Sequence, residues 1–195
     1  MARAAQGQRE VAIKLRAEMK VYLDNVATSG QVLEDLVPED EMQAVRSLGA
    51  AAKSGELELV TSRESWREQE RTRDAAKRAK LRAAQHQTPT VELDHVLRGY
   101  NTVYDYLGGF VTNVLLTEIV DEPLFSDLKA IGLNAADARH LMYAATNECV
   151  RFVTLDPDFI TRRTSLESRC PTVRIVRPTE LWQELKPGAT LGSAS

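Results

Sequence analysis

The sequence predicts an α/β fold, with a three-layer α/β/α arrangement around a central parallel sheet of four to five strands. Two observations lead to this prediction. Short apolar runs alternate along the chain with longer segments of helical periodicity, and two of the runs are almost continuous in apolar residues. Strands that are buried on both faces of a parallel sheet have this character. The length of 195 residues is enough for one domain of ordinary size.

Each predicted strand is a short apolar run between turn or capping signals. The strands are residues 21–23, 57–60, 150–155 and 172–176. The helices are predicted from apolar residues three and four positions apart. Several start at a capping residue such as Ser62 or Asn134, and the first ends at Gly55. The helices are residues 38–53, 63–86, 89–107, 123–131, 134–147, a helix that starts at Asp156, and 179–185.

These elements are expected to form one domain over residues 19–182. Residues 1–18 and 183–195 are polar or rich in small residues, and we expect both segments to be flexible. Residues 83–120 are expected to be a helical insertion, because an apolar stripe at helical spacing runs through much of this segment. Residues 110–120 fit neither period and are assigned to no element.

Composition limits the classes of protein. With 25 Lys and Arg against 28 Asp and Glu, the net charge of −3 excludes a uniformly basic chain that coats nucleic acid. No apolar run approaches the ~18 residues of a membrane helix, and no secretory signal is evident. A cytoplasmic protein without membrane contact is therefore expected. Cys149 and Cys170 lack the spacing of a zinc site and are expected to be reduced thiols.

Five carboxylates are expected at one edge of the sheet. Asp24 and Asp156 end predicted strands, and Asp158 follows two residues later. Asp137 and Glu68 lie in the first and second turns of predicted helices. Ligands of such folds bind outside the carboxyl ends of the strands. Each acid also has a structural interpretation, as a helix cap, a turn residue or part of a solvated helix face.

Clustered carboxylates raise one another's pKa values unless a cation neutralises them. A site of oxygen ligands suits Mg²⁺ or Mn²⁺, which bind phosphate oxygens and orient water in phosphodiester hydrolysis. At this edge no candidate nucleophile is paired with a base, and the sequence has no glycine-rich phosphate loop. The pattern therefore favours metal-dependent hydrolysis of a phosphodiester.

The same residues resemble the PIN-domain family, metal-dependent nucleases that mostly act on RNA. The resemblance covers about residues 19–80 and 124–182. Its most specific parts are the Asp-Ala-Arg-His sequence at 137–140 and the Thr-Leu-Asp-Pro-Asp-Phe sequence at 154–159. The strand that ends at Asp24 and the segment from Val60 to Glu68 resemble the family's first and second acid motifs.

The resemblance implies an endoribonuclease whose acidic quartet binds Mg²⁺ or Mn²⁺. The quartet is Asp24, Glu68, Asp137 and Asp156. Asp158 is a further implied metal ligand, and Thr154 and Asn25 are implied auxiliary residues. Glu64, one helical turn before Glu68, is an alternative for the second acid. Some members are toxins of toxin–antitoxin pairs, so the implied partners are RNA, an antitoxin protein and a second copy of the chain in a homodimer. Asn25 departs from the hydroxyl residue that toxin-like members often carry.

Two groups of arginines are candidate contact residues. Arg63, Arg67 and Arg71 line up on the predicted 63–86 helix and are expected to bind RNA phosphates. The alternative is a solvated face in which acids are interleaved with these arginines. The second group could contact RNA or an acidic protein partner. It consists of Arg162, Arg163, Arg169, Arg174 and Arg177.

Other functions are open at this point. A PIN-like module that binds nucleic acid without cleaving it is the main alternative, although such a module need not keep four acids. A phosphatase with an aspartate nucleophile is less favoured, because it needs a second Asp two residues after Asp24 and position 26 is Val. His140 shares a helix face with Asp137 and is either a metal ligand or a hydrogen-bonding residue of the helix packing.

Overall fold

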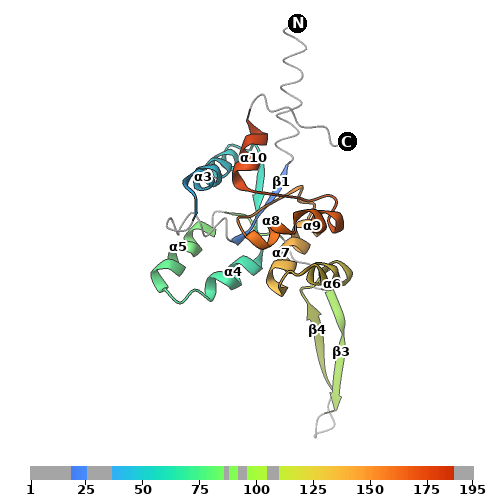
Figure 1. Ribbon diagram of the computed structural model, residues 1–195. Coiled ribbons are helices and arrows are strands. Elements are labelled where there is room, and N and C mark those ends of the chain that lie inside the picture. Colours follow the sequence, from blue (N-terminus) through green and yellow to red (C-terminus); the bar gives the residue numbers. More distant parts are fainter. Residues whose placement is uncertain (1–18, 26–36, 86–87, 92–95, 105–109, 187–195) are drawn as a thin grey trace.

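The computed structural model describes residues 19–25, 37–85, 88–91, 96–104 and 110–186 (Figure 1). Within these ranges, four parallel strands form one sheet and eight helices pack around it, which confirms the predicted α/β class. The order of the strands in the sheet is β2-β1-β5-β6. The strands are β1 (Lys20–Leu23), β2 (Glu58–Val60), β5 (Arg151–Val153) and β6 (Arg174–Val176).

Alternate residues of these strands point to opposite sides of the sheet and enter two different apolar clusters. Tyr22 and Phe152 belong to one cluster, and Val21 and Val153 belong to the other. The first cluster includes buried residues of the helices α6 (Glu122–Ile131), α7 (Ala135–Thr146), α8 (Pro157–Thr161) and α9 (Arg163–Arg169). The second includes residues of α3 (Glu39–Lys53) and α10 (Pro178–Leu185). Burial on both faces explains why the strands lack polar alternation.

Local signals in the sequence place the helix ends. The Asn134 side chain accepts hydrogen bonds from the backbone N–H groups of Ala136 and Asp137, at 2.8 and 3.0 Å, and so caps α7. Ser62 caps α4 (Arg63–Glu70). Gly55 follows α3 with a φ of 77°, a backbone conformation that glycine adopts without strain. These ends agree with the predictions.

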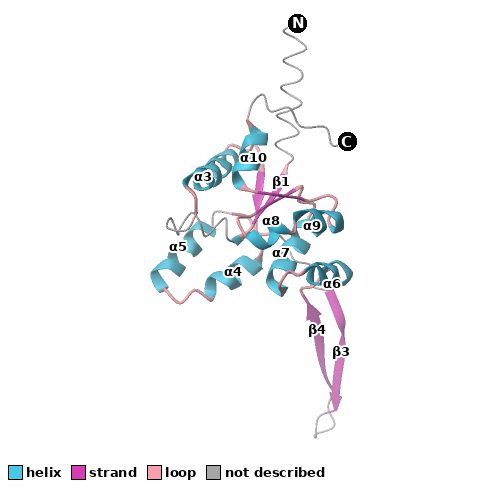
Figure 2. Ribbon diagram, in the orientation of Figure 1, coloured by secondary structure: helices cyan, strands magenta, loops and turns pink. Residues whose placement is uncertain are grey.

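The long charged helix predicted over residues 63–86 is wrong, because the chain forms two helices there (Figure 2). After α4, a turn leads into α5 (Ala75–Gln85). The Asp74 carboxylate accepts a hydrogen bond from the backbone of Lys77 at 2.9 Å, and the Arg78 guanidinium donates to the carbonyl of Thr72 at 2.8 Å. An acidic residue that can accept from the backbone therefore restarts the helix in a new direction.

The predicted helical insertion over residues 83–120 is also wrong beyond α5. The strands β3 (Val96–Tyr104) and β4 (Phe110–Thr117) form an antiparallel hairpin that extends away from the helices in Figure 1. The segment is rich in β-branched and aromatic residues, which favour strands, and Gly108-Gly109 is a hairpin signal in the sequence. Its apolar residues fit both a helical and a strand period, so periodicity alone does not separate the two. The sequence predicts that Thr90 lies in a helix over residues 89–107, but Thr90 instead forms a parallel β-bridge with Thr61.

The chain termini and the cysteines complete the comparison with the predictions. Residues 1–18 and 187–195 lie outside the described ranges, whereas residues 183–185 belong to α10 and not to a tail. Cys149 and Cys170 are free and buried, and burial raises the pKa of their thiols to about 12 and about 11. Among the helices that the structure describes, none is both long and apolar enough to cross a bilayer.

Candidate active site

Asp24 is a buried carboxylate at the end of the central strand β1. Its backbone N–H donates to the carbonyl of Val153 on β5, at 3.0 Å, which fixes the strand end. Its carboxylate accepts hydrogen bonds from the Thr154 hydroxyl and from the Asn25 backbone N–H, each at 2.7 Å. Burial raises the pKa of Asp24, and the charge of His140 and the Thr154 hydrogen bond only partly oppose this.

Thr154 links two of the predicted acids. It is fully buried just after β5, and its hydroxyl donates to Asp24 while accepting a hydrogen bond from the Asp156 backbone N–H at 3.0 Å. Asp156 caps α8, since its carboxylate accepts from the backbone of Asp158 at 2.7 Å. One hydroxyl thus links the carboxylate of Asp24 to the backbone of Asp156 at the ends of two neighbouring strands.

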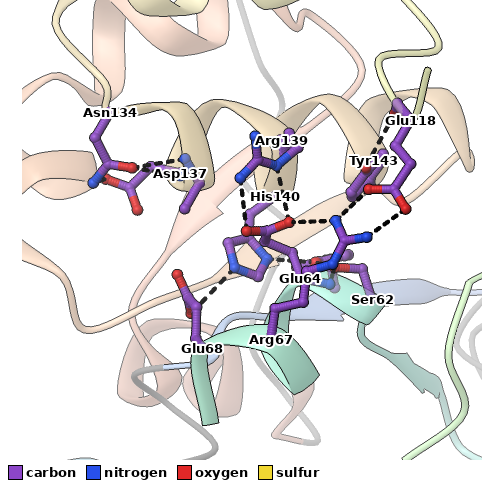
Figure 3. A network of polar contacts seen from close by, with 12 residues as sticks. Ser62, Glu64, Arg67, Glu68, Glu118, Asn134, Asp137, Arg139, His140 and Tyr143 are labelled. Carbon is purple, nitrogen blue, oxygen red and sulfur yellow. Dashed lines mark hydrogen bonds and ion pairs between the residues drawn. The ribbon is translucent and has the colours of Figure 1, made fainter. Parts of the chain in front are cut away.

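Asp137 lies in the first turn of α7, where its carboxylate accepts a hydrogen bond from the Asn134 amide at 2.7 Å (Figure 3). Its pKa is raised to about 7, first by burial and then by the negative charges of other acids, while His140 acts in the opposite direction. The acids that raise it are Asp24, Asp156 and Glu68. Four carboxylates from different parts of the chain therefore act on one another electrostatically.

Glu68, on α4, faces the buried ring of His140 on α7. Nε2 of His140 is 3.4 Å from Oε2 of Glu68, an ion-pair distance at which the geometry falls short of a hydrogen bond. Nδ1 of His140 is 2.7 Å from the hydroxyl of Tyr22, which in turn donates to the Ser62 hydroxyl at 2.6 Å. Burial disfavours the charged ring, but the neighbouring Glu68 and Asp24 outweigh this effect and raise the pKa of His140.

Glu64 occupies a different environment from Glu68, although one helical turn separates them. Its fully buried carboxylate accepts two hydrogen bonds from the Arg139 guanidinium, at 2.9 and 2.7 Å, and lies 3.4 Å from Arg67 (Figure 3). Burial acts to raise the pKa of Glu64, but the hydrogen bonds and charge of Arg139 prevail and lower it. Arg67 also forms an ion pair with Glu118, just after β4. This arrangement favours Glu68 over Glu64 as the second acid.

Several predicted contact residues are engaged within the chain. Asp158 is 60% exposed and pairs with Arg162 at 2.5 Å. Most of the second arginine group forms intramolecular ion pairs as well. These pairs are Arg163 with Glu180, Arg169 with Asp127, and Arg177 with Glu41. Because these arginines already pair with acids of the same chain, the second arginine group has less positive charge available for a partner than the sequence alone indicates.

The arginines of α4 differ among themselves. Arg67, predicted to bind RNA, is held by Glu118 and Glu64. Arg63 and Arg71 are exposed, and within the described ranges neither forms an ion pair. Arg73 in the turn after α4 is exposed in the same way. RNA binding by Arg63 and Arg71 stays a prediction that their exposure permits.

Sequence reasoning missed the residues that hold these acids in place. Arg139, Tyr22 and Ser62 lie within the motif segments, but no role beside the acids was predicted for them, and only the position of His140 three residues after Asp137 signalled a relation to the acids. Asn25, an implied auxiliary residue, accepts a hydrogen bond from the Gln69 amide at 3.2 Å and so connects β1 to α4. In the part of the chain that the structure describes, the His, Cys, Asp and Glu side chains form no group of three or more in ligand geometry.

Comparison with known protein families, with curated proteins and with solved structures finds no match for this chain. Its function therefore has to be argued from the residues themselves.

Proposed function

We propose that the chain is a metal-dependent endoribonuclease with the three-layer α/β/α arrangement of PIN domains. The observation that carries the proposal is the convergence of acids from different segments: Thr154 hydrogen-bonds both the Asp24 carboxylate and the Asp156 backbone, and burial together with the charges of Asp24, Asp156 and Glu68 raises the pKa of Asp137 to about 7. A fold gains no stability from carboxylates that repel one another. Such groups are typical of sites whose ligand supplies the missing positive charge.

The chemistry of these donors fits Mg²⁺ or Mn²⁺, because all four are carboxylates, two of them just after strands of the parallel sheet and two on the helices α4 and α7. Asp24, Glu68, Asp137 and Asp156 would hold the ion, and Asp158 could join them by leaving Arg162. When bound, the ion supplies positive charge to the phosphate and lowers the pKa of a water molecule. The Thr154 hydroxyl and the Asn25 N–H orient the Asp24 carboxylate. To hold the ion, Asp137 would act as a carboxylate, although its pKa in the metal-free protein is raised to about 7.

The substrate in this proposal is RNA. Arg63 and Arg71, exposed on the helix that carries Glu68, would bind phosphates on either side of the cleaved bond. A homodimer and an antitoxin protein are further proposed partners, which follow from the PIN resemblance alone. The alternative, a module that binds nucleic acid without cleaving it, uses the same basic residues but needs no acids.

The test is a cleavage assay on a broad panel of fluorescent RNAs with Mn²⁺ or Mg²⁺, run beside melting curves. The single variants are Asp24→Asn, Glu68→Gln, Asp137→Asn and Asp156→Asn, and Asp127→Asn on the surface of α6 is the matched control. Each site variant should lose at least about a thousandfold in rate, which corresponds to about 4 kcal/mol. The control should cleave like the wild type.

Robust cleavage by two or more folded site variants would overturn the mechanism. RNA binding by a wild-type protein that cleaves nothing with either metal would favour the non-catalytic module.

A further inference from the structure

The hydroxyl of Tyr22 links two buried side chains beneath the acids. It donates to the Ser62 hydroxyl at 2.6 Å and lies 2.7 Å from Nδ1 of His140. A tyrosine hydroxyl has one proton, and here that proton points to Ser62. The oxygen of Tyr22 must therefore accept from His140, so the hydrogen-bond network assigns a proton to Nδ1 of this ring.

The opposite nitrogen of the same ring points toward Glu68. Nε2 of His140 is buried without a hydrogen-bond partner, in a residue that is 1% exposed, and the carboxylate of Glu68 lies 3.4 Å away. The ring is fixed in this orientation by its bond to Tyr22, whose own ring meets it edge-on at 5.9 Å between centroids. With Nδ1 already protonated, Nε2 attracts the Glu68 carboxylate only if it carries a proton as well, because a lone pair at this position would repel the carboxylate.

We propose that Ser62, Tyr22 and His140 form a positioning chain that sets the location of the Glu68 carboxylate. The proposal rests on the proposed function, because Glu68 matters as one of the acids that hold the metal. The positioning chain orients Glu68 through an ion-pair contact at 3.4 Å, whereas the Thr154 hydroxyl orients Asp24 through a hydrogen bond at 2.7 Å.

Glu68 needs such a support more than the acids at the strand ends do. Its side chain is long and 23% exposed, whereas Asp24 is buried and bonded on two sides. The positioning chain runs from Ser62, the N-cap of α4, through Tyr22 on the central strand to His140 on α7, the helix that also carries Asp137. One helix therefore fixes the relative positions of two acids that come from segments far apart in the sequence.

Nuclear magnetic resonance of the histidine side chains tests the positioning chain of Ser62, Tyr22 and His140 without any metal or RNA. The protein has three histidines, so the His140 signals are assigned by their disappearance in His140→Gln. We expect a slowly exchanging proton on Nδ1 that disappears in Tyr22→Phe, together with a change in the Nε2 nitrogen shift in Glu68→Gln. An Nδ1 without a proton, or an Nε2 shift that is the same in wild type and Glu68→Gln, would overturn the proposal.

The dependence of RNA cleavage on Mn²⁺ concentration tests whether the positioning chain supports metal binding by Glu68. Tyr22→Phe keeps the ring that stacks on Phe152 at 5.3 Å between centroids and removes only the hydroxyl. It should raise the Mn²⁺ concentration for half-maximal cleavage by about tenfold, more than it lowers the rate at saturating Mn²⁺. Ser62→Ala is a poorer test, because Ser62 also caps α4.

The matched control is Tyr143→Phe, which removes the hydroxyl of another buried tyrosine, one that donates to the Glu118 carbonyl at 3.0 Å. It should leave the Mn²⁺ dependence as in the wild type. Equal shifts in the two variants would show a general loosening of the packing and contradict a positioning role. If the wild type cleaves no RNA but the resonance changes occur, the positioning chain is supported and the ribonuclease proposal is contradicted.

Discussion

The helices α4 and α7 carry two groups of charged residues that lie side by side and behave oppositely. Glu64 is matched by the guanidinium of Arg139, and its pKa is lowered although its side chain is fully buried. The pKa of Asp137 is raised to about 7, first by its burial and then by the charges of other acids, and His140 only partly opposes this. Burial acts to raise the pKa of both carboxylates, so the difference between them is that Glu64 has the counter-charge of Arg139 and Asp137 has acids around it.

Glu64 and Glu68 lie one helical turn apart on α4 but belong to different groups, since Glu64 pairs with Arg139 and Glu68 lies with the other acids. The cluster of Glu64, Arg139, Arg67 and Glu118 joins α4, α7 and the segment after β4. At the acidic edge, by contrast, the pKa values of Asp24 and Asp137 are raised, so the folded protein disfavours their ionised forms. A protein retains such a cost when the same groups bind something that the free protein lacks.

The largest expected effect comes from breaking the matched group. Arg139→Leu leaves the buried Glu64 carboxylate without its main partner and should lower the free energy of unfolding by about 3 kcal/mol, measured by urea denaturation. The double variant Glu64→Gln with Arg139→Met removes both charges and should recover more than half of this decrease. Equal decreases in the single and double variants would contradict the ion pair as the cause.

A cation that binds at the acidic edge should instead raise the free energy of unfolding. Mn²⁺ at about 100 times its dissociation constant should raise the free energy of unfolding by about 2.7 kcal/mol, measured as a rise in melting temperature. Asp24→Asn should abolish this rise, and because burial raises the pKa of Asp24, the variant should be more stable than the wild type in a chelator. A full Mn²⁺ response in Asp24→Asn would place the metal elsewhere.

The pH dependence of stability should show the repulsion directly. With a chelator present, Asp137 is protonated in the folded protein below about pH 7, whereas the unfolded chain keeps this proton only below about pH 4. The native state therefore binds more protons in this window, and stability should rise as the pH falls from 7 to 5. The change is of the order of 1 kcal/mol, because Asp137 is only half-buried and water screens its charge.

Asp137→Asn should remove most of this slope. What remains should come from His140 and Asp24, whose raised pKa values also give a stability that is present at low pH and is lost as the pH rises through their folded-state values. A slope that is as steep in Asp137→Asn as in the wild type would contradict the assignment.

The smallest expected effect concerns the arginines of α4 and of its C-terminal end. Replacing the exposed Arg63 and Arg71 with Gln should reduce the slope of log affinity against log salt for single-stranded RNA by about 0.7 for each phosphate that is no longer bound. Arg67→Gln should leave the slope as it is, since Glu118 and Glu64 already hold that guanidinium. Binding is measured by fluorescence anisotropy in a chelator, where no cleavage is expected. Equal slopes in all three proteins would favour a solvated face that RNA does not touch.

The sequence was enough to predict where the acids lie along the elements. Asp24 and Asp156 follow apolar strands, and Asp137 follows the capping residue Asn134, so each position is readable from its immediate neighbours. Parallel strands bring such ends to one edge, and this is why a local pattern predicts a site formed by distant segments.

The choice between Glu64 and Glu68 could not be made in the same way. It depends on Arg139, which is 75 residues from Glu64, and on His140, whose partner Tyr22 is 118 residues away. The hairpin of β3 and β4 was missed for another reason. Its apolar residues satisfy the helical and the strand period together, and only β-branched content and the Gly-Gly pair separate the two.

The position of β1 in the sheet has a consequence for how the protein is made. β1 is the first strand of this sheet to leave the ribosome, yet it lies between β2 and β5, and Tyr22 pairs with Phe152, which is synthesised 130 residues later. At a typical elongation rate this delay is about ten seconds. During that time the edge that joins Asp24 to Asp156 does not exist, so an unfinished chain has no complete acidic site. Activity should therefore begin only once the strand at Arg151–Val153 has been synthesised and paired, and such distant pairing is slow to form.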